Sequence, residues 1–266
     1  MVVLISGGTS GIGKAIAELL NKEGHQVFAA GRRVEKQLSA SGISTVKMDV
    51  TNVQSVKQAV ETIIHEAGKI NVLIQCAGQG AIGPMEEFSA DEVAEVFNLN
   101  LLGILRLNKA VIPHMRQQNS GKIILISSLA AETGLPYQGV YCASKAALDV
   151  ITESLRMEIK SFGIQACVLQ PGDFKTEVAH HRQLPVLEKN SPYKEIFERI
   201  NATSTSKVET AGDPVIVAKK VSKILKKRKL RPKYRVGSPV ELIMPVVKSL
   251  IPSAWFEKLL MKYYEL

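Results

Sequence analysis

The stretch that decides the fold lies at the start of the chain, VVLISGGTSGIGKAIAELL at residues 2–20. Its first four residues are apolar, as in a buried strand, and its last part has the spacing of a helix. Between them Gly7, Gly11 and Gly13 permit a tight turn and a close approach of the backbone to a pyrophosphate. Exposed N–H groups and the positive end of the helix dipole would complete an anion site. The spacing is G-x-x-x-G-x-G, not the commoner G-x-G-x-x-G, and it predicts a nucleotide-binding strand–turn–helix unit.

The same alternation of short apolar runs and helix-period segments continues along the chain. Glycines at 24, 68 and 163 end three of the helical segments, as expected for the left-handed position after a helix. Apolar strands separated by helices favour a parallel sheet covered on both faces. We therefore expect an α/β chain over residues 1–266, a single-domain doubly wound parallel sheet (Rossmann) in three α/β/α layers. The expected strands are 2–6, 26–30, 44–48, 71–75, 122–127 and 164–170, and the expected helices are 12–23, 53–67, 89–117 and 141–162.

The composition of the chain indicates which partners and which cellular compartment are expected. The 266 residues are 45% hydrophobic, enough for one large core, and no apolar stretch approaches the roughly 20 residues of a membrane span. The first strand leaves no room for a signal peptide, and three cysteines without metal-ligand spacing indicate reduced thiols, so we expect a cytoplasmic protein without a metal. The charge of +9 is densest at 223–235, interpreted as a solvated helix end and loop. Nothing resembles a recognition helix, so nucleic acid is not an expected partner.

Two later segments depart from the alternation. Residues 173–212 are polar, contain Pro185 and Pro192 and show no clear strand. An irregular segment at the carboxyl ends of the strands fits a substrate flap, the alternative being a surface excursion without function. At 238–266 apolar clusters alternate with lysines. This C-terminal extension is expected to form helices packed on the core; the alternative is a membrane-surface element acting with the basic run before it.

The end of the second strand indicates which dinucleotide is bound. An acidic residue there would bind a free ribose 2′-hydroxyl, and a basic one a 2′-phosphate. Gly31 occupies the position of the acid, and Arg32 and Arg33 follow. Because guanidinium groups suit phosphate, NADP(H) is favoured over NAD(H). The alternative is that one arginine, Arg33 rather than Arg32, only faces water.

The glycine-rich turn, together with YCASK at 141–145, resembles the short-chain dehydrogenase/reductase family over about the first 175 residues. QCAG at 75–78 departs from the family's N-N-A-G, which puts a polar contact at the sheet in doubt. The resemblance implies the catalytic residues Asn100, Ser128, Tyr141 and Lys145. It implies cofactor contacts at Gly7, Thr9, Ser10, Gly11, Ile12, Gly13, Arg32, Arg33, Asp49, Val50, Ala77, Gly78, Tyr141, Lys145, Pro171, Gly172 and Thr176.

Tyr141 and Lys145 are expected to act together in proton transfer. Four residues apart on a helix, they share a face, and an ammonium beside a phenol lowers the phenol pKa from its usual value of about 10. The resemblance implies that Tyr141 is the general acid and that Ser128 binds the substrate oxygen. It further implies that Lys145 holds the nicotinamide ribose and that Asn100 anchors a water linking Lys145 to solvent.

Beyond residue 175 the resemblance narrows. QPGDFKT, SPYK, GDPVIVA and RPKYRVG are similar to the branch that holds hydroxysteroid and retinol dehydrogenases and acyl-dihydroxyacetone-phosphate reductases. This implies an NADPH-dependent oxidoreductase acting on a lipophilic steroid, retinoid or lipid ketone. The alternatives are a 3-oxoacyl thioester reductase and a non-catalytic NADP(H)-sensing protein. The family also implies a homodimer or homotetramer, formed through the helices of 89–117 and 141–162.

Overall fold

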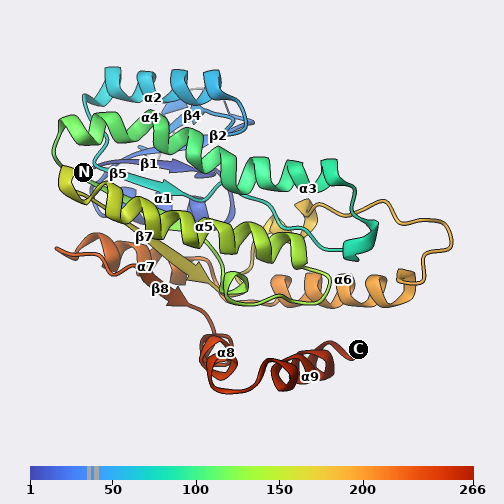
Figure 1. Cartoon of the computed structure of the whole chain (residues 1–266). Coiled ribbons are helices and arrows are strands. Elements are labelled where there is room, and N and C mark those ends of the chain that lie inside the picture. The colour runs from blue at the N-terminus through green and yellow to red at the C-terminus, as the bar shows by residue number, and fades with distance from the viewer. Residues whose placement is uncertain (35–36, 39–41) are drawn as a thin grey trace.

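One sheet organises the molecule (Figure 1). The structure, a computed structural model, describes residues 1–34, 37–38 and 42–266. Within them the strand order is β3-β4-β2-β1-β5-β6-β7-β8, and every neighbouring pair is parallel except β3 with β4. The strands are β1 (Val2–Ser6), β2 (Gln26–Gly31), β3 (Gln37–Leu38), β4 (Ser44–Lys47), β5 (Val72–Gln75), β6 (Gly121–Ile126), β7 (Ile164–Pro171) and β8 (Lys233–Val236).

Helices cover both faces of this sheet, which confirms the predicted three-layer fold (Figure 1). Alternate residues of β1 point to opposite faces: Leu4 packs in the core under α2, α4 and α5, and Val3 and Ile5 in the core under α1 and α7. The helices are α1 (Gly11–Lys22), α2 (Val53–Ala67), α3 (Ala90–Phe97), α4 (Gly103–Gln117), α5 (Gly139–Glu158), α6 (Lys194–Glu209), α7 (Val215–Leu225), α8 (Pro239–Leu250) and α9 (Ser253–Tyr264), with short turns η1 (Met85–Glu87), η2 (Asn98–Leu102), η3 (Leu129–Glu132), η4 (Lys160–Phe162) and η5 (Glu177–His181).

The prediction for the basic run was wrong in part, because it contains a strand. β8 pairs with β7 and buries Tyr234. The exposed part of the run lies at the amino end of β8, where the Lys122 ammonium donates to the carbonyl oxygens of Leu225 (2.7 Å) and Lys227 (2.8 Å). The last residues of the run reach the extension, because Lys233 and Arg235 donate to the Glu132 carboxylate and Lys248 of α8 donates to the carbonyl oxygen of the same residue. A membrane surface shared by the run and the extension stays a prediction.

The predicted flap is also more regular than expected. Residues 194–209 form helix α6, which buries Phe197, Ile200 and Val208 against the rest of the chain. The flap is also attached to the loop after β5, because Gln183 forms an isolated parallel bridge with Ala81. This segment is therefore a wall fixed to the rest of the chain at several points, including the hydrogen bond from the Tyr193 hydroxyl to the Glu86 carboxylate.

The C-terminal extension forms α8 and α9, beyond the carboxyl end of β8 (Figure 1). It is attached by polar contacts: the Arg199 guanidinium of α6 donates to the Glu265 carboxylate (2.7 Å), and the Lys248 ammonium to the carbonyl oxygen of Glu132 (2.6 Å). Phe256 and Leu260 are buried. The packing favoured from the sequence is therefore present, although several large apolar side chains stay exposed: Val240, Ile243, Val246, Leu250, Trp255, Leu259, Met261 and Tyr263.

In the described part of the chain, no helix combines the length and the apolar character needed to cross a membrane.

Candidate active site

The glycine-rich turn between β1 and α1 has no room for larger residues. Gly7 has a φ of 66°, and a Cβ atom on it would lie 2.9 Å from the backbone nitrogen of Ala77. A Cβ atom on Gly13 would overlap the carbonyl oxygen of Gly7. Ser10 is the N-cap residue of α1, and its side chain makes no capping hydrogen bond. The first-turn N–H groups are therefore left for a ligand, and the turn fits a dinucleotide phosphate.

The end of β2 forms the neighbouring wall. A Cβ atom on Gly31 would lie 2.5 Å from the Thr9 hydroxyl oxygen, so an acidic residue cannot stand there without displacing Thr9. Arg32 and Arg33 are exposed and line the large cavity described below. The Asp49 carboxylate accepts hydrogen bonds from the backbone N–H (2.9 Å) and the hydroxyl (2.7 Å) of Thr51. Asp49 thus stabilises the turn before α2.

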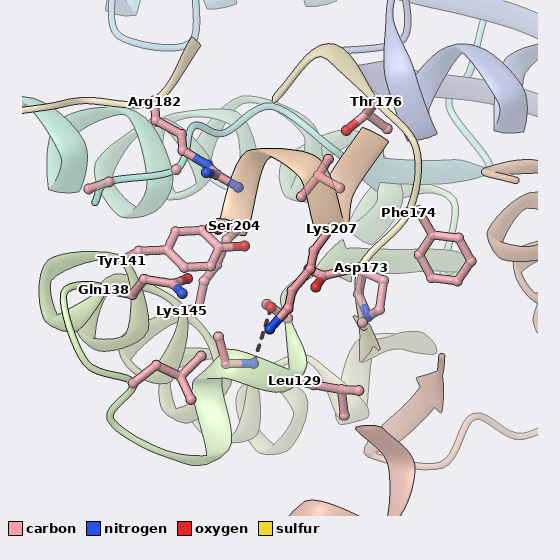
Figure 2. Close-up of a pocket in the computed structure, with 18 of the residues that line it drawn as sticks. Leu129, Gln138, Tyr141, Lys145, Asp173, Phe174, Thr176, Arg182, Ser204 and Lys207 are labelled. Carbon is pink, nitrogen blue, oxygen red and sulfur yellow. Dashed lines mark hydrogen bonds between the residues drawn. The ribbon is translucent and has the colours of Figure 1, made fainter. Parts of the chain in front are cut away.

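Tyr141, Lys145 and Ser128 come from two adjoining elements. Tyr141 and Lys145 lie on α5, one turn apart, and Ser128 follows β6 as the N-cap of η3. The Ser128 hydroxyl accepts from the backbone N–H of Ala130 (3.1 Å) and is hydrogen-bonded to Tyr141. The Lys145 ammonium donates to the carbonyl oxygen of Ile126 (3.2 Å) and lies 5.8 Å from the centre of the Tyr141 ring. Figure 2 shows Tyr141 and Lys145 beside one pocket.

The expected lowering of the Tyr141 pKa by Lys145 is not found in the structure. Burial raises the pKa of Tyr141 to about 12, although the hydrogen bond with Ser128 and the charge of Arg182 act in the opposite direction. Burial also lowers the pKa of Lys145 to about 8, against the attraction of Cys76 and Asp149. The physical reason is that desolvation disfavours the charged form of both groups and outweighs their proximity. At neutral pH Tyr141 is therefore protonated and can donate a proton.

We predict that kcat/KM for carbonyl reduction falls as the pH rises through about 8. The folded-state pKa of Lys145 is depressed to about 8, so the ammonium form is present below that pH and is lost above it. Tyr141 remains protonated across this range. The measurement is a pH profile of kcat/KM with folding checked by circular dichroism at each pH. A profile that stays flat to pH 9.5 would contradict the prediction.

Asn100 lies behind the pocket in the π-helical turn η2, fully buried. Its amide donates to the carbonyl oxygen of Gln79 (2.9 Å) and to the hydroxyl oxygen of Ser144 (3.0 Å), and its oxygen accepts from the N–H of Gln79 (2.9 Å). It thus joins the loop after β5 to α5, the helix that carries Lys145. Both amide hydrogens are occupied, so a water could be held only through the second lone pair of its oxygen. The water relay stays a prediction.

Gln75, which stands where the family has asparagine, has a hydrogen-bond partner in the structure. The Gln75 amide donates to the side-chain oxygen of Asn108 on α4 (2.7 Å), and both residues are buried. The second amide atom of each residue has no protein partner. Gln75 therefore makes a buried polar contact between β5 and α4.

A cavity of about 1240 Å³ joins most of these residues. A smaller one of about 120 Å³ adjoins Gly7, Val50 and Ala77. Of the predicted residues, Asn100 and Asp49 lie off both walls, and the others line one cavity or both. The sequence did not predict the residues that close the far side: Gln138, Asp173, Arg182, Ser204, Lys207 and Glu241.

Comparisons with known proteins agree with this arrangement. The family model for short chain dehydrogenases matches residues 1–185. A 3-ketodihydrosphingosine reductase from Bacteroides thetaiotaomicron is 35% identical over 264 residues, which cover 99% of this chain and 97% of that protein. The chain belongs to the short-chain dehydrogenase/reductase family, and it is an oxidoreductase that acts on CH–OH groups with a nicotinamide cofactor.

Two solved structures share the fold. A short-chain dehydrogenase from Streptomyces avermitilis superposes with a TM-score of 0.82 at 28% identity, covering 97% of this chain and 95% of that one. A short-chain dehydrogenase/reductase from Burkholderia phymatum, described as a complex with NAD, has a TM-score of 0.81 at 24% identity, covering 93% and 92% of the two chains. The similarity thus extends through the C-terminal region, beyond the matched family model.

Proposed function

We propose that this protein is an NADPH-dependent reductase of a lipophilic ketone, with a long-chain lipid ketone as the favoured substrate. The observation that carries the proposal is the continuity of the large cavity, which runs from the glycine-rich turn past Tyr141 to walls formed by α6, α8 and α9. Those walls include Ile200, Val208, Met244, Phe256 and Leu260. Apolar side chains of the cavity wall near a proton donor suit an alkyl-bearing carbonyl. The name of the Bacteroides relative, a ketolipid reductase similar over nearly its whole length, supports the lipid class.

The side chains around Tyr141 suit reduction. A bound nicotinamide would supply the hydride, and negative charge would then develop on the substrate oxygen. Tyr141 would donate its proton to that oxygen, and Ser128 would stabilise the oxygen through its hydroxyl. Lys145 would restore the proton and hold the ribose, in a position fixed by the carbonyl oxygen of Ile126. Because Tyr141 is protonated at neutral pH, the resting enzyme holds the acid that reduction requires.

The test is an NADPH-oxidation assay with substrates of several classes. We expect the highest kcat/KM with a long-chain aliphatic ketone, and lower values with a steroid, a retinoid and a 3-oxoacyl thioester. Faster turnover of the thioester would favour the alternative, a 3-oxoacyl thioester reductase. The absence of turnover with every carbonyl, despite NADPH binding, would contradict the proposal.

Cofactor preference gives a separate prediction for Arg32. Arg32→Asp should weaken NADPH binding roughly 10- to 100-fold, because a charge-assisted phosphate contact is replaced by repulsion, while NADH binding should change little. Arg33→Asp is the matched control, and a smaller effect there would identify Arg32 as the main phosphate ligand. The measurement is the dissociation constant of each dinucleotide by fluorescence titration. Undiminished NADPH preference in Arg32→Asp would remove Arg32 from the site.

We also propose that α8 and α9 rest on a lipid surface. Val240, Leu259 and Tyr263 are exposed and also line the cavity, so the cavity reaches exposed apolar side chains of α8 and α9. Trp255, 70% exposed, has the amphipathic ring typical of interfacial anchors. Residues 238–266 contain three lysines and three glutamates, so apolar insertion, not attraction to anionic lipid, would dominate.

Vesicle flotation tests this proposal. The full-length protein should float with neutral phosphatidylcholine vesicles, and added anionic lipid should change the bound fraction little. The double variant Leu250→Glu with Trp255→Glu should reduce binding several-fold, because charges do not enter the acyl region. Val53→Glu, an exposed apolar position at the start of α2, is the control and should bind as the wild type does. Equal binding by all three proteins would contradict the proposal.

Association into a dimer or tetramer stays a prediction. Exposed apolar side chains on α4 and α5, including Leu105, Val150 and Met157, are available for it. Sedimentation velocity would give the oligomeric state directly, and a monomer would contradict the prediction.

A further inference from the structure

A buried carboxylate lies on α5 one turn beyond Lys145. This residue, Asp149, is 6% exposed, and its carboxylate accepts a hydrogen bond from the side-chain amide of Gln170 on β7 (2.6 Å). The same carboxylate lies 3.4 Å from the Lys233 ammonium on β8. Burial raises the pKa of Asp149, while hydrogen bonds from Ser127 and Gln170 and the charge of Lys233 act in the opposite direction. Because it has a cation beside it, the group is a carboxylate at neutral pH.

A second carboxylate, Glu132 at the end of η3, belongs to the same cluster. It accepts hydrogen bonds from the Gln170 amide (2.8 Å), the Lys233 ammonium (2.8 Å) and the Arg235 guanidinium (3.0 Å). Burial opposes its ionisation, yet the hydrogen bonds from Lys233, Gln170 and Arg235 lower the pKa of Glu132 to about 2. Two cations of β8 thus face two carboxylates, and of these cations Lys233 is the one within ion-pairing distance of Asp149.

Ser127 connects this cluster to the proton-transfer groups. Its hydroxyl is hydrogen-bonded to Asp149 and lies 3.4 Å from the carbonyl oxygen of Lys145. Ser127 directly precedes Ser128 in the chain, and Ile126 before it accepts the hydrogen bond from the Lys145 ammonium (3.2 Å). Asp149 therefore adjoins both the strand end that leads to Ser128 and the helical turn that carries Lys145.

The charged state of Lys145 depends on its neighbours. Among the described residues, the titratable groups that face its ammonium are the Tyr141 phenol, the Cys76 thiol and the Asp149 carboxylate. Burial raises the pKa of Cys76 and of Tyr141 to about 12 each. Both groups are therefore neutral in the range where Lys145 titrates, since burial lowers its pKa to about 8. Cys76 attracts the ammonium only as a thiolate, so in this range Asp149 is the member of the three that carries a negative charge.

We propose that Asp149 is a positioning residue of the reduction, a buried carboxylate that keeps Lys145 charged and fixed beside Tyr141. Asp149 lies outside the walls of the large cavity, so it acts through Lys145 and not on the substrate or cofactor. Lys233 of the edge strand β8 supplies the cation that allows this acid to be buried as a carboxylate. The inference rests on the proposed reduction, in which Lys145 restores the proton of Tyr141.

Asp149→Asn tests this role through the pH profile of kcat/KM for ketone reduction. Asparagine keeps an oxygen that can accept from Gln170 and removes the negative charge. Without that charge the pKa of Lys145 falls further, so the alkaline limb of the profile should move to lower pH. At pH 8 kcat/KM should fall several-fold relative to the wild type. Near pH 6 it should change little, because the ammonium form still dominates there.

The pKa of Lys145 can also be measured without substrate, by carbon-13 NMR of lysine side chains in the full-length protein. The resonance of Lys145 is assigned by its loss in Lys145→Met, and its titration should move to lower pH in Asp149→Asn. Glu153→Gln is the matched control, because Glu153 is an exposed carboxylate one turn beyond Asp149 on α5, and it should titrate as the wild type does. Lys233→Met should move the titration to higher pH, because Asp149 then loses its neutralising cation.

The outcomes separate this inference from the proposed function. An unchanged titration of Lys145 in Asp149→Asn would overturn the inference, and so would an equal loss of kcat/KM at every pH, which indicates a purely structural role. If the wild type reduces no lipid ketone, the proposed function fails, and the NMR titration still decides whether Asp149 sets the charge of Lys145. If Asp149→Asn does not fold, Lys233→Met decides the question, because a titration that stays in place or moves to lower pH contradicts the inference.

Discussion

Tyr141→Phe should lower kcat for ketone reduction by roughly 10²- to 10⁴-fold, the usual contribution of a positioned general acid. The substitution removes the hydroxyl that would protonate the substrate oxygen and keeps the ring, which packs against Ala81, Val96 and Val140. The fold and the nucleotide site should therefore persist, and the dissociation constant for NADPH should stay nearly unchanged. Single-turnover kinetics with a fluorescence titration of NADPH provide both quantities.

The matched control for this experiment is Tyr137→Phe. Tyr137 lies four residues before Tyr141, and its ring stacks on Phe197 of α6, with ring centres 6.3 Å apart. Loss of its hydroxyl should leave kcat within a small factor of the wild type. The assignment of Tyr141 as the proton donor is refuted if Tyr141→Phe retains a tenth of the wild-type kcat.

Gly13→Ala should weaken NADPH binding by roughly 10- to 100-fold and also lower thermal stability. The added methyl group would overlap the carbonyl oxygen of Gly7, so the turn must move away from the shape that fits a pyrophosphate. Forced overpacking of this kind costs about 1–3 kcal/mol, distributed between folding and binding. The measurements are the NADPH dissociation constant and the melting temperature of the same preparation.

Gly24→Ala separates the two effects. Gly24 has a φ of 79°, and a Cβ atom on it would meet nothing within 4 Å. Alanine there is strained by the backbone alone, so stability should fall while NADPH affinity stays unchanged. If Gly13→Ala binds NADPH as tightly as the wild type, the phosphate-binding role of the turn is wrong.

The sheet could be predicted because its strands repeat one physical pattern. Five of the six expected strands are largely apolar and buried, β4 being the exception with only Val46 buried, and the described strand bounds differ from the expected ones by one residue at most. β8 was missed because it is a four-residue edge strand in a basic run, with only Tyr234 buried. Helix α6 was missed because three buried apolar residues in four turns give a weak amphipathic signal.

The site was predictable where a short stretch of sequence fixes the residues and unpredictable where the fold brings separate segments together. Glycines at 7 and 13 are required by contacts that no larger residue allows, so their spacing in the sequence carries the information. Asp173, Arg182 and Lys207 come from three separate segments, and only the fold brings them together around Tyr141. The expectation that Lys145 lowers the pKa of Tyr141 was wrong for a similar reason. Helical spacing gives the distance between the two residues, but it gives no measure of the burial that raises this pKa.

The Glu241 carboxylate touches Gly172 and binds the backbone N–H of Asp173. Glu241 thus joins helix α8 to the loop after β7, where cofactor contacts are expected at Gly172 and Thr176. Hybrid enzymes built by grafting the last third of one family member onto the first two thirds of another would cross this seam. Such a graft would keep this contact where the incoming helix carries an acid in the same place. New specificities built on this scaffold thus depend on contacts made by residues far from the proton donor in sequence, Glu241 among them.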